Sequence, residues 1–115
     1  MLEVHTIPAL TDNYIYLIHD SQSKQTIVID PSLARPVCQF LKEKQWNLDA
    51  IWNTHHHWDH TGGNLELKQK YHCKIYGPQE TKNPIPGMDQ GLNETDHLKI
   101  GNKTVQIIET PGHTA

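Results

Sequence analysis

The run His55-His56-His57-Trp58-Asp59-His60 constrains the fold and chemistry of this chain more than any other feature. Alternate residues of an extended segment point the same way, so His55 and His57 can meet one metal ion. Asp59 and His60 follow where the chain turns towards a helix, so they can face a second ion. Imidazole nitrogen combined with a carboxylate suits Zn²⁺ or Fe²⁺ better than Ca²⁺ or Mg²⁺. The run therefore predicts a site for two metal ions.

A third ligand for the first ion is expected at His113, which follows a predicted strand on the tight turn Pro111-Gly112. A catalytic zinc keeps three protein ligands and leaves one position for water. Two ions about 3.5–4 Å apart can share a hydroxide, lower its pKa towards about 7 and polarise a carbonyl. A purification tag or a chance surface cluster is the alternative. The interruption of the run by Trp58 and Asp59, and its position after a strand, argue against both.

The other histidines lack the spacing of metal ligands. His56 lies between two predicted ligands and would point away from them, so we expect it to pack or to donate a hydrogen bond. The three tryptophans are expected in the core or in the walls of the site. We expect structural or solvent-exposed roles for His5, His19, His72 and His97.

Composition limits the possible partners. The 115 residues suit one small domain or a piece of a larger one. A formal charge of −3 argues against nucleic acid or an anionic membrane, and no apolar stretch approaches the roughly 20 residues that span a bilayer. The amino terminus does not resemble a signal peptide. Cys38 and Cys73 are expected to be small, half-buried hydrophobic residues in a reducing cytoplasm. We expect a monomer that acts on a small molecule.

Hydrophobic patterning predicts an α/β fold. We expect strands at residues 2–7, 14–18 and 26–29, joined by polar turns as an antiparallel meander. Residues 35–46 have apolar side chains at helical spacing, and residues 50–53 form a short buried strand that leads into the histidines.

The remaining expected elements are a helix at 65–71 capped by Asn64, a strand at 74–76, an irregular loop at 79–93 and a hairpin of strands 97–100 and 103–108. This order predicts a mixed sheet with helices on at least one face. It also leaves no element to cover the other face.

Five stretches resemble one known family. Thr54-His-His-His-Trp-Asp-His-Thr-Gly-Gly63 is similar to the metal-binding signature of the metallo-β-lactamase superfamily, and its triple histidine with tryptophan resembles glyoxalase II (hydroxyacylglutathione hydrolase). The other stretches that resemble this family are Ile7-Pro-Ala-Leu-Thr-Asp-Asn-Tyr14, Val28-Ile-Asp-Pro31, Tyr76-Gly-Pro-Gln-Glu80 and Thr110-Pro-Gly-His-Thr114. Together they cover essentially the whole chain.

The resemblance implies a role for each matching residue. His55, His57 and His113 would bind the first metal, and Asp59 and His60 the second. Asp30 would hold the histidine loop without touching metal, although an aspartate that caps the turn at the strand's end explains it equally well. The implied cofactors are two divalent ions, zinc by preference, with iron or manganese also tolerated.

The resemblance also implies a fold and a reaction. Residues 1–115 would form the amino-terminal half of a metallo-β-lactamase-like αββα sandwich, without the helical domain that binds substrate. The implied reaction is hydrolysis of S-D-lactoylglutathione to D-lactate and glutathione, a step of methylglyoxal degradation. A hydroxide bound to the metals would attack the thioester carbonyl, with no separate catalytic side chain. The glutathione contacts cannot be assigned.

The chain departs from this family in length. Members continue past the Pro-Gly-His motif to an aspartate that bridges both metals and to a further histidine. The sequence contains neither, so we expect this piece alone to be inactive. Three alternatives remain open: a persulfide dioxygenase with one Fe(II), a lactonase, and a metal-binding remnant without activity. The pair Asp59-His60, which a second metal would need, argues against the dioxygenase with a single iron.

Overall fold

The structure is a computed structural model that describes residues 2–9, 13–54, 62–78, 85, 87–92 and 98–105. Its first three strands are β1 (Leu2–Ala9), β2 (Asn13–Asp20) and β3 (Gln25–Ile29). All three pair antiparallel, as the polar turns between them predicted. β1 and β2 extend further than predicted, because Pro8 and Ala9 pair with Tyr14 and Asn13 across the sheet.

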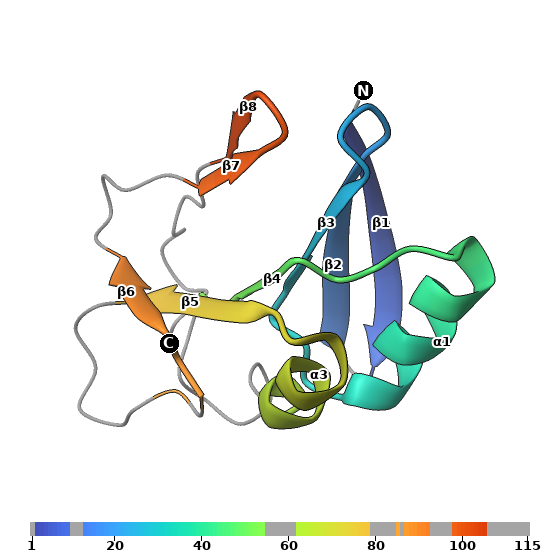
Figure 1. Ribbon diagram of the computed structural model, residues 1–115. Coiled ribbons are helices and arrows are strands. Elements are labelled where there is room, and N and C mark those ends of the chain that lie inside the picture. The colour runs from blue at the N-terminus through green and yellow to red at the C-terminus, as the bar shows by residue number, and fades with distance from the viewer. Residues whose placement is uncertain are drawn as a thin grey trace.

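The next strands are parallel to β3 and make the sheet a mixed one. They are β4 (Ala50–Trp52), β5 (Lys74–Pro78) and β6 (Gln90–Leu92), and the strand order is β1-β2-β3-β4-β5-β6 (Figure 1). β6 corrects the prediction of an irregular loop at 79–93. Its three residues lack a strand pattern and are held by pairing with β5, where Gln90 lies opposite Tyr76.

Two helices pack together beside the sheet (Figure 1). In α1 (Ala34–Lys44), Val37 and Leu41 are fully buried, as their spacing predicted. The helix ends earlier than predicted because Gln45 adopts the left-handed conformation with φ 61°, which closes a helix. The second helix is α3 (Asn64–Tyr71), which buries Leu67.

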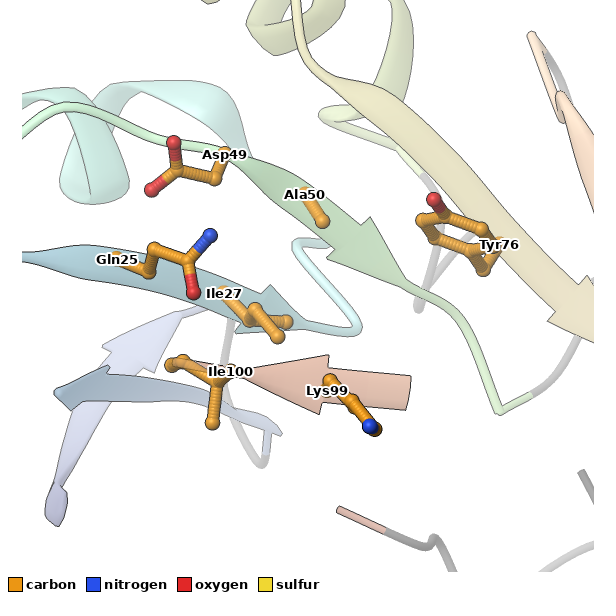
Figure 2. A pocket seen from close by; sticks show the side chains of 7 residues that line it. All are labelled: Gln25, Ile27, Asp49, Ala50, Tyr76, Lys99 and Ile100. Atoms are coloured by element: carbon orange, nitrogen blue, oxygen red, sulfur yellow. The ribbon is translucent and has the colours of Figure 1, made fainter. Parts of the chain in front are cut away.

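The sheet has an apolar core on each face, because successive strand residues point to opposite sides. Ile51 of β4 belongs to the core under the helices, whereas its neighbours Ala50 and Trp52 belong to the second core. The hairpin of β7 (Leu98–Ile100) and β8 (Lys103–Val105) covers part of that second face with Ile100 (Figure 2). This corrects the prediction that no element covers the other face of the sheet. The predicted hairpin is thus confirmed up to residue 105.

His19 is structural, as expected. It is buried, its Nδ1 lies 2.8 Å from Thr26 Oγ1, and its ring stacks on Trp46 at 3.6 Å between centroids. His5 lies against Phe40 and Trp46 in the same cluster, and His72 is exposed at the end of α3. His97 lies outside the described residues. Within the part of the chain that is described, no helix is long and apolar enough to cross a membrane.

Candidate metal centre

The predicted metal ligands lie outside the described residues. His55, His57, Asp59 and His60 belong to residues 55–61, which we name the histidine segment, and His113 lies beyond residue 105. Among the described residues, no group of three or more His, Cys, Asp or Glu side chains could hold a metal. What the structure does define is how the chain enters and leaves the histidine segment.

The segment begins at the carboxyl end of β4. Asn53 follows the strand, and its backbone N–H donates to the carbonyl of Tyr76 on β5 at 2.8 Å. Thr54 is the last described residue before the segment. In α/β sheets, ligand sites form outside the carboxyl ends of the parallel strands. The predicted ligands therefore start where this class of fold places its binding sites.

Asp30 binds Thr54, the residue directly before the histidine segment. The Thr54 backbone N–H donates to Asp30 Oδ1 at 2.8 Å, and the Thr54 hydroxyl donates to Asp30 Oδ2. Asp30 is buried and has a left-handed φ of 52°, which aspartate tolerates better than most residues. Its own N–H donates to the carbonyl of Trp52 at 3.0 Å. Asp30 thus turns the chain after β3 and also binds the residue before His55.

Gly63 fixes the chain after the histidine segment through backbone contacts. Its N–H donates to the carbonyl of Pro31 at 2.7 Å. A Cβ at this position would lie 2.7 Å from Ala34 N and 2.8 Å from both Leu33 C and Pro31 O. These are backbone atoms that cannot move aside, so the close approach of α3 to the β3–α1 connection requires glycine here.

Asn64 corrects a prediction. The sequence suggested that it caps the second helix, but Gly63 is the cap residue and Asn64 is the first residue of α3. Its fully buried side chain instead donates from Nδ2 to Oδ1 of the equally buried Asn53, at 2.5 Å. Sequence reasoning missed this pair. The sequence feature that could have indicated this pair is an asparagine on each side of the histidine segment.

A salt bridge fastens α3 to the sheet. Lys68 Nζ lies 2.8 Å from Asp89 Oδ1 and donates to the carbonyl of Gly87 at 2.9 Å. The other oxygen of Asp89 accepts the backbone N–H of Ile75 at 2.8 Å. The hydrogen bond from Lys68 lowers the pKa of Asp89. The helix that follows the histidine segment is therefore tied to β5 through Asp89.

A pocket of about 150 Å³ lies elsewhere, between the sheet and the β7–β8 hairpin (Figure 2). Gln25 begins β3 and Asp49 precedes β4, so both lie at the opposite end of these strands from Thr54. The part of the pocket lined by Gln25 and Asp49 therefore lies away from Thr54. Its lining residues are Gln25, Ile27, Asp49, Ala50, Tyr76, Lys99 and Ile100.

Comparisons with known proteins agree with this arrangement. The family model described as Metallo-beta-lactamase superfamily matches residues 10–115. A hydroxyacylglutathione hydrolase of Methylococcus capsulatus is 42% identical over 115 residues, which are 100% of this chain and 45% of that protein. The protein of the same name from Rhodospirillum rubrum is 45% identical over 113 residues, covering 98% of this chain and 44% of its own length. The chain thus spans a little under half the length of these curated relatives.

The fold is also similar to that of solved structures. The crystal structure of BLEG-1 B3 metallo-beta-lactamase superposes with a TM-score of 0.76 at 25% identity, covering 98% of this chain and 63% of that one. The mixed sheet, the helices on one face and the family match over nearly the whole chain lead to one conclusion. This chain belongs to the metallo-beta-lactamase superfamily.

Proposed function

We propose that the protein containing this chain is a metal-dependent hydrolase that cleaves the thioester S-D-lactoylglutathione to D-lactate and glutathione. The observation that carries the proposal is the similarity to hydroxyacylglutathione hydrolases, at about 40% identity over the whole chain. Asp30 and Gly63 support it, because they fasten both ends of a segment rich in metal-binding side chains.

The donor set of the histidine segment fits the proposed metals. Imidazole and carboxylate together suit zinc, and iron or manganese is tolerated. His55, His57 and His113 would hold the first ion, and Asp59 and His60 the second. Bound there, the two ions would supply an acidified water and polarise the thioester carbonyl.

The described residues contribute by holding this segment. Asp30 binds Thr54 next to His55, and Pro31 binds Gly63 on the far side, so one short connection fixes both ends. Because a misplaced ligand costs metal affinity, this support is part of the site.

The setting of the reaction is also proposed. Hydrolysis of this thioester would serve methylglyoxal degradation in the cytoplasm, by a monomer that needs neither nucleic acid nor membrane. The names of the relatives support a glutathione thioester as substrate. The charge of −3 supports the exclusion of nucleic acid.

The test uses the protein expressed from the open reading frame that contains residues 1–115. We expect bound zinc, release of glutathione from S-D-lactoylglutathione, loss of this activity with a chelator and its return with zinc. Asp59→Asn should abolish the activity, and Glu66→Gln on the exposed side of α3 should not change it. Oxygen uptake with glutathione persulfide would instead identify a dioxygenase. Bound metal without turnover on thioester, persulfide or lactone would identify a remnant.

A further inference from the structure

Two asparagines join the two ends of the histidine segment to each other. Thr54 alone separates Asn53 from the start of the segment, and Gly62 and Gly63 separate its end from Asn64. Neither asparagine side chain is accessible to solvent. Their hydrogen bond from Asn64 Nδ2 to Asn53 Oδ1 measures 2.5 Å. The Asn53 backbone is itself tied to Tyr76 of β5 at 2.8 Å. The end of β4 and the start of α3 are therefore held together inside the protein.

This contact differs from the others at the site. Asp30 and Pro31 bind each end separately to the β3–α1 connection, whereas the asparagine pair links one end directly to the other. A side-chain hydrogen bond restricts both distance and direction, which apolar contact does not. Buried amides cost free energy unless they are paired, so a pair that served only to fill space could be replaced by apolar residues of the same shape.

We propose that Asn53 and Asn64 are positioning residues whose buried hydrogen bond sets the span of the histidine segment, and with it the spacing of the metal ligands on that segment. The inference rests on the proposed function, because it takes His55, His57, Asp59 and His60 to bind metal. Loss of contacts that orient metal ligands typically lowers metal affinity about 10–100-fold. Asn53 and Asn64 would act in this way without touching metal.

The experiment compares zinc affinity with fold stability in one set of variants of the expressed protein. Zinc affinity is measured by competition with a chromophoric chelator, and stability by urea unfolding of the metal-free protein. Asn53→Leu and Asn64→Leu should each reduce both quantities, because each breaks the hydrogen bond between the two buried amides. The double variant should regain part of the stability lost in the single variants, since it buries neither amide, yet its zinc affinity should stay about tenfold or more below the parent.

Thr26→Val provides the matched control. It removes the buried contact between Thr26 and His19 on the same sheet, 2.8 Å long, far along β3 from the histidine segment. We expect it to reduce stability and leave zinc affinity unchanged. A loss of zinc affinity in this variant equal to that of Asn64→Leu would show that general destabilisation explains the effect, and would overturn the proposal.

The double variant decides the outcome. If it folds and binds zinc within about threefold of the parent, well short of the usual cost of losing a supporting contact, the pair is only structural and the proposal is wrong. If it does not fold, Asn53→Asp, which keeps the acceptor for Asn64, is compared with Asn53→Leu, and equal zinc affinities would overturn the proposal. A parent protein that hydrolyses the thioester separates these outcomes from failure of the proposed function.

Discussion

Thr54 donates two hydrogen bonds to Asp30, one from its backbone N–H to Oδ1 at 2.8 Å and one from its hydroxyl to Oδ2. The acceptor lies directly after β3, and the donor lies directly before His55. This contact connects two parallel strands at their carboxyl ends, where the predicted ligands begin. Asp30, in the stretch Val28-Ile-Asp-Pro31 that resembles the family, thus has a defined partner directly before the histidine segment.

Asp30→Ala should destabilise the protein and lower its affinity for zinc. The half-buried Thr54 N–H would lose its acceptor, at a cost towards the lower end of about 1–3 kcal/mol, and zinc affinity should fall about 10–100-fold. Asp30→Asn keeps Oδ1 as acceptor and should lose less of both. Urea unfolding and zinc competition measure the two effects. An Asp30→Ala variant with parental zinc affinity would show that Asp30 only shapes the turn after β3.

Gly63→Ala tests the close approach of α3 to the β3–α1 connection. The added Cβ would lie 2.7 Å from Ala34 N, so backbone must shift, at a cost of about 1–3 kcal/mol of unfolding free energy. Gly77→Ala is the matched control, because the atoms in its way are side-chain ends, Ile85 Cδ1 at 2.5 Å and Met88 Sδ at 3.2 Å. Chemical denaturation should show a clearly smaller loss for Gly77→Ala. Equal losses would contradict the steric explanation.

Stability should fall as pH is lowered, in part through His19. Burial lowers the pKa of His19 below its ordinary value of about 6.5, so the folded protein keeps this ring neutral. The unfolded chain takes up the proton first, and the contribution of His19 is therefore lost as pH falls below about 6.5. Glu3 and Asp20 oppose this shift, whereas Lys24 and His5 reinforce it.

The measurement for His19 is urea unfolding from pH 8 to pH 5. The parent is compared with His19→Phe, which differs from it only at this side chain and keeps an aromatic ring against Trp46. The variant should show the shallower dependence on pH. Parallel curves for the two proteins would mean that protonation of His19 does not contribute to the loss of stability.

The two cysteines should react differently with iodoacetamide. Burial raises the pKa of Cys73 to about 11, so its thiol stays protonated at neutral pH, and its side chain is shielded from solvent. Cys38 is only half-buried. Mass spectrometry of the native protein should find the label on Cys38 before Cys73, and on both after unfolding in urea. Early labelling of Cys73 would contradict its buried position.

The patterned elements of this fold were predictable from local sequence. β1 is indicated by weak alternation, β2 by aromatic and β-branched residues, β3 by a short apolar run, and α1 by apolar residues at helical spacing. Gln45 was assigned to α1 because nothing in the apolar pattern marks the left-handed residue that ends the helix. β6 was missed because a strand of three residues depends on its neighbour β5 rather than on its own pattern.

The site was only partly predictable for a related reason. Histidine spacing predicts metal ligands because a metal site requires those residue types close together. The local capping rule predicts Asn64 as a helix cap, whereas its side chain binds Asn53 on the other side of the histidine segment. Asp30 follows β3 and binds Thr54, whereas its support of the metal ligands stays a prediction.

Two metal ions held by the histidine segment and His113 would be visible in anomalous diffraction at the zinc edge, from crystals of the expressed protein. We expect two peaks about 3.5–4 Å apart. One should be bound by His55, His57 and His113, and the other by Asp59 and His60. A single peak, or peaks bound by other residues, would overturn the proposed two-metal site.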